Sequence, residues 1–265
     1  MTISTPSWQE LAEIAADLAW RAGRLTLADF QVGVEVERKA DATPVTRADR
    51  GAEALLRREL RNRFPADGIL GEEEGEDVGS GERTWILDPI DGTKSFIHGV
   101  PLYAVLVAVA DAARRPAVGV IHLPALGETV VAWRGGGCWW NGRRAHVSTI
   151  DALGDGLLVT SDVPGESAHA AAESRLDRLL AAPRLRRTWG DAYGYALVAT
   201  GRAEVMIDPV ASPWDLAAVQ PIIEEAGGVF TDLDGVAHPW GGSGLAAPPA
   251  LHAAALALVD RSPSA

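Results

Sequence analysis

The sequence predicts an α/β fold in which a layered α+β half, about residues 1–150, precedes an α/β half, about residues 151–265. In the first half, three β-rich runs follow one another, and antiparallel pairing of such neighbours is the natural arrangement. In the second half, strand-like runs alternate with helix-like segments. Gly165 and Pro183 lie in connections and mark no clean linker, so we expect one unit, 1–265, with both halves joined through a continuous sheet system.

The first half begins with two predicted helices. Ser7-Trp8-Gln9-Glu10 is a capping-box pattern, after which apolar residues recur at helical spacing as far as Leu25. Thr46 can cap a second helix that ends before Pro65. Between the helices, valines alternate with Gly and Glu over 32–36, which predicts a half-buried strand.

An acidic run, residues 71–77, follows a short predicted strand at 67–70. Acidic runs are most often solvated loops. This run directly follows one predicted strand and precedes the next, which begins with Trp85-Ile86-Leu87. Its position therefore makes it a candidate part of a site.

The strand at Trp85 runs directly into the turn Asp88-Pro89-Ile90-Asp91-Gly92-Thr93. Pro89 fixes φ and Gly92 permits backbone conformations that most residues avoid, so the turn holds its two carboxylates close. Such carboxylates repel unless they share a proton or face a cation, and a hard divalent ion is the common solution. Asp-Pro and Asp-Gly pairs are also frequent in ordinary turns. The turn predicts a metal site, and the rest of the chain must decide between these readings.

The remaining elements follow from strand composition and from alternation. Gly135-Gly136-Gly137 lacks the ending of a phosphate-binding loop and precedes a hairpin-like turn, so we assign it a structural role. A last strand near Val229 and a C-terminal helix complete the chain. The other strands are expected at 102–110, 117–123, 128–133, 157–160, 185–188 and 204–207, and the other helices at about 168–180, 192–200 and 213–226.

Composition excludes several classes of partner. With 47% hydrophobic residues in 265, the chain can bury a substantial core. Its 24 Lys and Arg against 36 Asp and Glu give a net charge of −12, which argues against a nucleic acid or an anionic membrane as the main partner. A small anionic substrate would need cations, which suits a site that binds metal first and phosphate second.

The single cysteine and the N-terminus predict a cytoplasmic setting. Cys138 cannot form an internal disulfide, and the start lacks the basic and apolar segments of a secretory signal. No uninterrupted apolar run approaches the length that crosses a bilayer.

Three motifs in order give the chain a family resemblance: Gly71-Glu72-Glu73, the turn Asp88 to Thr93, and Pro213-Trp214-Asp215. Together they resemble the inositol monophosphatase family of metal-dependent phosphomonoesterases over nearly the whole length. Further matches are Lys39, Asp41, Val45-Thr46 and Asp49 in an N-terminal loop, and Glu224-Glu225-Ala226-Gly227-Gly228. The resemblance implies an α-β-α-β-α sandwich that forms a homodimer.

The resemblance also implies a set of site residues. It implies that two or three Mg²⁺ ions are held by oxygen ligands: Glu72, Asp88, Asp91, Asp215 and the carbonyl of Ile90. Thr93, with Glu72 nearby, is expected to activate the attacking water, and Asp49 to face Thr93 or another metal-bound water. Gly92 and Thr93 can offer backbone N–H groups to the phosphate if a helix starts there, and Asp215 also faces the substrate. As an alternative, Asp215 can be a plain first-turn acid after Pro213.

The metals would suit the chemistry of a phosphate monoester. Its dianion repels hydroxide, and the in-line transition state spreads charge over peripheral, attacking and leaving oxygens. One ion lowers the pKa of a bound water, and another screens the leaving alkoxide. The six histidines show no paired metal spacing, so a histidine-based zinc site is not predicted.

The stretch Arg187 to Tyr195 looks like the histidinol-phosphatase branch of the family. Asp191 stands where inositol phosphatases more typically carry a small or hydroxyl residue, and a carboxylate there suits an amine or imidazole. Asp208 lies where the family places a substrate-recognition acid, and Arg187 is a candidate phosphate contact. The alternative is structural, because Asp191 can cap the following helix and Asp208 can end a strand.

The sequence thus predicts a Mg²⁺-dependent phosphatase that hydrolyses L-histidinol phosphate. Another phosphomonoesterase of the family, acting on an inositol phosphate, a sugar bisphosphate or a nucleotide 3′-phosphate, is the nearer alternative. A non-catalytic regulatory or binding protein is the more distant one. It would be expected to lose a ligand acid or Thr93, and neither loss is found.

Overall fold

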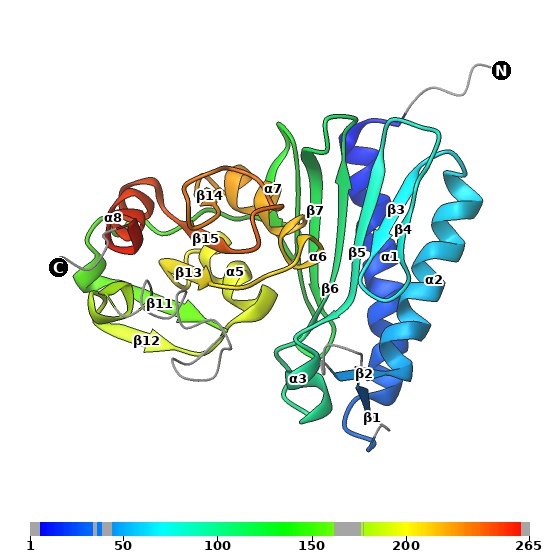
Figure 1. Cartoon of the computed structure of the whole chain (residues 1–265), viewed down its shortest axis with the longest axis horizontal. Coiled ribbons are helices and arrows are strands. Elements are labelled where there is room, and N and C mark those ends of the chain that lie inside the picture. The colour runs from blue at the N-terminus through cyan, green and yellow to red at the C-terminus, as the bar shows by residue number, and fades with distance from the viewer. Residues whose placement is uncertain (1–5, 34–35, 39–43, 162–175, 177, 261–265) are drawn as a thin grey trace.

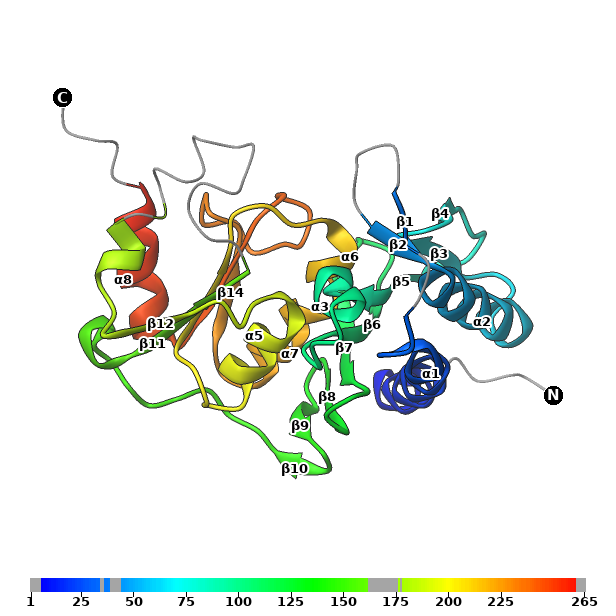
Figure 2. The same ribbon diagram turned by 90° about the horizontal axis from the view of Figure 1, so that it is seen from below.

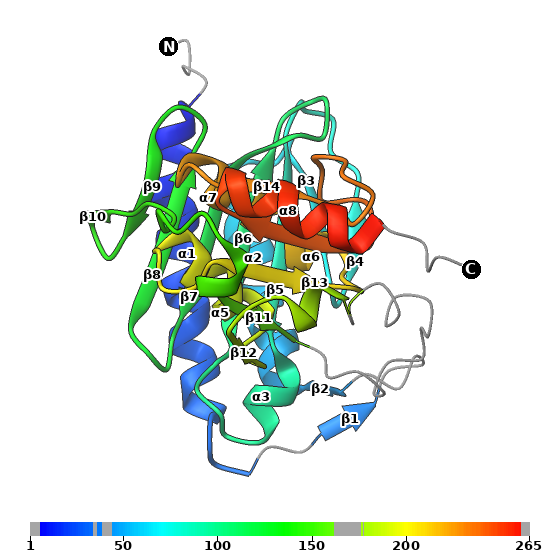
Figure 3. The ribbon, with the colours of Figure 1, turned by 90° about the vertical axis from the view of Figure 1, so that its left-hand side faces the viewer.

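The computed structural model describes residues 6–33, 36–38, 44–161, 176 and 178–260, and they form five layers (Figure 1). Helices α1 (Trp8–Asp29) and α2 (Arg47–Arg63) form the first layer, against an eight-stranded sheet. Helices α5 (Asp191–Ala199) and α7 (Val219–Glu225) lie between that sheet and a five-stranded sheet (Figure 2). Helix α8 (Pro249–Asp260) covers the outer face of the smaller sheet (Figure 3). The predicted α-β-α-β-α sandwich is confirmed.

Both N-terminal helices begin with capping boxes. In α1, Ser7 Oγ accepts from the Glu10 N–H, and the Glu10 carboxylate accepts from the Ser7 N–H at 2.7 Å. Thr46 and Asp49 form the equivalent box at α2. These reciprocal bonds satisfy N–H groups that a helix start leaves without partners, which explains why both helices begin where the sequence predicts.

The larger sheet has the order β10-β9-β8-β7-β6-β5-β3-β4. All neighbours are antiparallel except β3 and β5, which are parallel. The sheet therefore brings the C-terminal ends of β3 and β5 to the same edge. The strands are β3 (Gly68–Gly71), β4 (Gly75–Asp77), β5 (Thr84–Asp91), β6 (Ala104–Ala110), β7 (Pro116–Leu123), β8 (Glu128–Trp133), β9 (Gly137–Trp140) and β10 (Arg143–Arg144).

Strand β6 shows why these strands are apolar on both faces. Val105, Val107 and Val109 pack in the core under α1 and α2. Leu106 and Ala108, on the opposite face, pack in the core shared with α5 and α7. Because side chains alternate between the two faces of a strand, a sheet covered by helices on both sides needs a continuous apolar run.

The smaller sheet has the order β12-β11-β13-β15-β14. Strand β11 is parallel to both β12 and β13, whereas β15 is antiparallel to β13 and β14. Thr160, the last residue of β11, lies opposite Ile207, so Ser161 follows β11 beside the end of β13. The strands are β11 (Leu157–Thr160), β12 (Leu185–Arg187), β13 (Val205–Asp208), β14 (Val229–Thr231) and β15 (Gly244–Ala247).

The helix predicted at 213–226 is two helices, α6 (Pro213–Leu216) and α7. Ala217 and Ala218 keep α-helical backbone angles, but Pro221 has no N–H to donate to the Ala217 carbonyl, so the helical hydrogen bonds are interrupted there. The Ala218 carbonyl packs directly on strand β7, where a Cβ atom added to Gly119 would lie 2.0 Å from that oxygen.

One strand prediction also needs correction, and strand β15 was missed. The segment 32–36 was expected to be a half-buried strand, but Val32 and Val36 are exposed. Of its described residues 32, 33 and 36, only Val36 belongs to a strand, β1 (Val36–Arg38), which pairs with β2 (Pro44–Thr46). Strand β15 was not predicted, because its small residues lack the β-branched pattern of a strand.

Some predictions fall outside the described residues. Most of the helix expected at 168–180 is among them, as are Lys39 and Asp41. The remaining short elements are α3 (Thr93–Ile97) and a 3₁₀ turn, η1 (Leu153–Asp155). Among the residues described, no helix combines the length and hydrophobicity that crossing a bilayer requires.

Candidate active site

A bulge at the end of β5 turns two acids to one side. Asp91 comes three positions after Asp88 in the chain, so a regular strand would point the two side chains to opposite faces. Opposite them, Leu106 and Ala104 are only two residues apart, which means that β5 carries one extra residue. Pro89 fits there because a bulge does not need its missing N–H.

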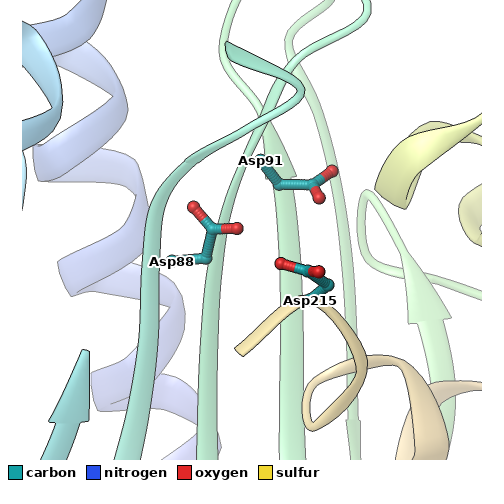
Figure 4. A group of neighbouring side chains, drawn as sticks. All are labelled: Asp88, Asp91 and Asp215. Carbon is teal, nitrogen blue, oxygen red and sulfur yellow. The ribbon is translucent and has the colours of Figure 1, made fainter. Parts of the chain in front are cut away.

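A third acid reaches the same place from the other half of the chain. Asp215 lies in the first turn of α6, where its Oδ2 accepts from the Ser212 N–H at 2.7 Å. Asp88, Asp91 and Asp215 each offer an oxygen, and these oxygens lie within 4.8 Å of one another (Figure 4). The structure therefore brings together three of the predicted metal ligands.

Burial makes this group costly without a cation. Desolvation raises the pKa of Asp88 well above its usual value, and the charges of Glu72, Asp91 and Asp215 raise it further. The pKa of Asp91 is raised in the same way, and that of Asp215 rises to about 7, mainly by desolvation. Two buried carboxylates and one half-buried carboxylate that repel one another are the donor set that a hard divalent cation prefers. The group fits such an ion.

Glu72 lies beside the three acids in the turn between β3 and β4. Gly71 pairs with Leu87 in the parallel register, and the Glu72 N–H donates to the Leu87 carbonyl at 3.2 Å. Glu72 therefore lies beside Asp88, which is on the neighbouring strand β5. Its carboxylate lines the same cavity, although it is not in the group whose oxygens lie within 4.8 Å.

The residues after the bulge also lie at the cavity. Gly92 has φ of +81°, in the left-handed region that glycine adopts without strain, and α3 begins at Thr93. The Thr93 hydroxyl donates to the Ile90 carbonyl at 3.0 Å. Gly92, Thr93 and Ile90 all line the cavity. Their expected contacts to phosphate, water and metal respectively stay predictions.

Asp49 is buried behind the cavity. Its Oδ2 accepts from the Thr46 N–H and hydroxyl at 2.8 and 2.6 Å, while its Oδ1 has no hydrogen-bond partner. Desolvation raises the pKa of this carboxyl, and the charge of Glu72 adds to the rise. Among the described residues no hydrogen bond joins Asp49 to Thr93, so its predicted orientation towards Thr93 stays a prediction.

Two more acids, which the sequence predicts as substrate contacts, line the same cavity. Asp208 ends β13 and Asp191 begins α5, and both line the cavity. Burial raises the pKa of Asp208 to about 7. The Asp191 N–H donates to Ser161 Oγ at 2.7 Å, and the Ser161 hydroxyl donates to Asp208 Oδ1 at 2.5 Å. One hydroxyl thus links both acids.

The sequence did not single out Ser161 or Lys94. Ser161 could have been found, because parallel strands β11 and β13 end at the same edge of their sheet. Lys94 is the one basic side chain among the described residues that line the cavity, whereas the predicted phosphate contact Arg187 is exposed outside that lining, over Trp189. The cavity encloses about 350 Å³, and its described lining residues are Pro44, Glu72, Asp88, Ile90, Asp91, Gly92, Thr93, Lys94, Ser161, Asp191, Asp208, Val210, Ala211 and Asp215.

Comparison with known proteins agrees with this geometry. Residues 7–264 match the model of the inositol monophosphatase family. The chain is 45% identical over 238 residues to a histidinol-phosphatase of Chlorobaculum parvum, covering 88% of this chain and 90% of that one. It is 35% identical over 235 residues to an inositol-1-monophosphatase of Rhizobium meliloti, covering 86% and 88%. The crystal structure of the extragenic suppressor protein suhB from Bartonella henselae superposes with a TM-score of 0.88 at 30% identity, covering 96% and 99%.

The fold and the acidic cavity are those of a phosphatase that acts on a small phosphorylated substrate. The chain belongs to the inositol monophosphatase family. Proteins of this family depend on metal, and the group Asp88, Asp91 and Asp215 could hold an ion.

Proposed function

We propose that this chain is a Mg²⁺-dependent phosphatase that hydrolyses L-histidinol phosphate to L-histidinol and phosphate, a step of histidine biosynthesis. The observation that carries the proposal is a pair of acids in the cavity that do not belong to the metal-ligand group. Asp191 and Asp208 line the cavity but are not in that group. They are therefore our candidates to face the part of the substrate that distinguishes one phosphate ester from another.

Two or three Mg²⁺ ions would be held by Asp88, Asp91, Asp215, Glu72 and the carbonyl of Ile90. When bound, they would supply a water of lowered pKa and screen charge on the leaving oxygen. The chain's own groups then orient the water. Because the Thr93 hydroxyl donates its only hydrogen to the Ile90 carbonyl, its oxygen is left as an acceptor for a water hydrogen. Glu72, on the same cavity wall, is the candidate to take the proton.

The phosphate would be bound between these ligands and the chain that follows the bulge. Gly92 and Thr93 are our candidates for backbone contacts to the phosphate oxygens, and Asp215 borders both the metal group and the substrate space. Since Arg187 is not among the described lining residues, we assign it no contact in this arrangement. Asp49 stays a candidate for orienting a water through its unpartnered oxygen.

Substrate preference would come from Asp191 and Asp208. Histidinol phosphate carries an ammonium and an imidazole, whereas inositol phosphate offers only neutral hydroxyls. A charge-assisted hydrogen bond from an ammonium to a buried carboxylate contributes about 1.5–3 kcal/mol. The higher identity to a histidinol-phosphatase, 45% against 35% for an inositol-1-monophosphatase, supports the same choice.

Inositol monophosphatase activity is the alternative that the second relative supports. The test is phosphate release from L-histidinol phosphate beside inositol 1-phosphate, with Mg²⁺ and with EDTA. We expect faster turnover of histidinol phosphate and none in EDTA. Preference for the inositol ester would overturn the substrate assignment, and turnover in EDTA would overturn the metal.

The proposal extends to assembly and location. We propose a homodimer in the cytoplasm, where the buried Cys138 would stay a free thiol. Light scattering on the purified chain tests the first part, since a monomer mass would contradict it.

A further inference from the structure

A buried ion pair on α2 takes no part in the site described above. Glu53 and Arg57 are one helical turn apart, their side chains are 0% and 2% exposed, and Arg57 Nε donates to Glu53 Oε1 at 2.7 Å. Burying two charges is expensive, and the attraction between them often does no more than offset that cost. The pair is therefore weak evidence for stability, and its other contacts indicate what it does.

Those contacts are all to the hairpin that carries Glu72. The Glu73 N–H donates to Glu53 Oε2 at 2.8 Å, and the Glu74 N–H donates to Glu53 Oε1 at 3.0 Å. The Glu53 carboxylate thus binds the two residues that directly follow Glu72, and it uses both oxygens to do so.

Arg57 holds the outgoing strand of the same hairpin. Its guanidinium donates to the Gly75 carbonyl and to Asp77 Oδ2, the latter at 3.0 Å. On the incoming strand, a Cβ atom added to Gly71 would lie 2.3 Å from Glu53 Oε1. Residue 71 therefore has to be glycine for the carboxylate to approach this closely, and the hairpin is fitted to the ion pair from both sides.

We propose that Glu53 and Arg57 are positioning residues that fix the turn so that Glu72 faces the divalent cation, and that they thereby set the affinity of the site for Mg²⁺. The inference rests on the proposed function. The opposite side of the turn is already anchored by the Glu72 N–H on Leu87. With both sides fixed, Glu72 is held beside Asp88 before any ion binds, and little ordering is left for binding to impose.

Glu53→Gln is the direct test. The glutamine keeps the size of the side chain but has one acceptor oxygen in place of two, so it cannot serve Arg57, Glu73 and Glu74 together. Losing a group that orients a metal ligand typically weakens metal binding about 10–100-fold. We expect that loss in the Mg²⁺ dissociation constant measured by calorimetry, and turnover restored by saturating Mg²⁺.

The control breaks a different ion pair at the far end of the same strands. Asp67 accepts from Arg83 at 3.0 Å and from the Trp85 indole at 3.0 Å, away from the cavity. We expect Asp67→Asn to lower thermal stability and leave the Mg²⁺ dissociation constant within about twofold. Exchange of the amide hydrogens of Glu73 and Glu74 should accelerate in Glu53→Gln and not in the control.

Mg²⁺ affinity in Glu53→Gln equal to that of the native chain would overturn the inference. If that variant does not fold, Arg57→Lys decides, since it keeps the charge and loses the fork that holds the Gly75 carbonyl and Asp77 together. We expect weaker Mg²⁺ binding there as well, and native affinity would contradict us. A native chain that binds no Mg²⁺ would instead refute the proposed function itself.

Discussion

Neutralising Asp215 should stabilise the cation-free protein while removing its response to Mg²⁺. The pKa of this carboxyl is about 7 in the folded chain against a usual value of 3.8, mainly because burial disfavours the charged form. The folded state therefore binds this proton more tightly than the unfolded state. Its contribution to stability is full below about pH 4 and is lost as the pH rises to about 7.

The structure gives the size of this effect. A pKa difference of about three corresponds to about 4 kcal/mol of stability lost at pH 8 when no cation is bound. Asp215→Asn removes the charge, and its amide oxygen can still accept from the Ser212 N–H. Allowing for imperfect repacking, we expect a net gain of about 1–3 kcal/mol, or about 2–9 °C in the unfolding temperature.

The assay is thermal unfolding of both proteins at pH 5 and pH 8, with EDTA or with Mg²⁺. The native chain should unfold at a lower temperature at pH 8 than at pH 5 in EDTA, and Mg²⁺ at a hundred times its dissociation constant should add about 2.7 kcal/mol at pH 8. Asp215→Asn should be more stable than the native chain in EDTA at pH 8 and gain little from Mg²⁺. Glu59→Gln, which removes an acid paired with Arg21, is the control and should respond to Mg²⁺ as the native chain does.

Two results would refute this reasoning. Asp215→Asn could prove less stable than the native chain in EDTA at pH 8, in which case the carboxylate is satisfied as a helix cap and carries no penalty. Alternatively, Mg²⁺ could stabilise the variant as much as the native chain, in which case Asp215 is not a ligand.

Two further predictions concern the same cavity. Asp88→Asn should nearly abolish turnover in a folded protein, because Asp88 is the acid on which the charges of Glu72, Asp91 and Asp215 all act, and it is a proposed metal ligand. Phosphate release and circular dichroism check this, and near-native turnover in a folded variant would contradict it. Thr93→Ala should lower kcat by about two to four orders of magnitude and leave Mg²⁺ affinity little changed, since the hydroxyl is proposed to orient water and not to bind metal. If calorimetry finds Mg²⁺ affinity reduced as strongly as kcat, Thr93 instead helps to form the metal site.

Much of the site could be predicted because its residues follow directly from the ends of strands. The turn after Trp85 and the acid after Pro213 are local patterns, and the structure places their carboxylates together. The reason that Asp88 and Asp91 face the same way was not accessible, because a bulge is defined by the partner strand. The split between α6 and α7, in contrast, has a local cause, because Pro221 cannot donate to the Ala217 carbonyl.

Other misses have a cause similar to that of the bulge. Strand β15 is made of small residues whose strand conformation is imposed by its neighbours β13 and β14. From the sequence alone, Glu53 would be expected to be an ordinary exposed acid on a helix. Only the packed structure shows that the hairpin after Gly71 covers it. Tertiary contacts decide such positions, and local sequence cannot supply them.

The assignment of the substrate depends on the wall that carries Asp191 and Asp208. The most direct measurement is kcat/KM for L-histidinol phosphate and for inositol 1-phosphate in the native chain and in Asp191→Asn and Asp208→Asn. We expect each variant to lose about tenfold to a hundredfold in kcat/KM for histidinol phosphate and little for the inositol ester, because only the former offers a cationic donor. An equal loss for both substrates would show that these carboxylates only support the fold, and would contradict the account.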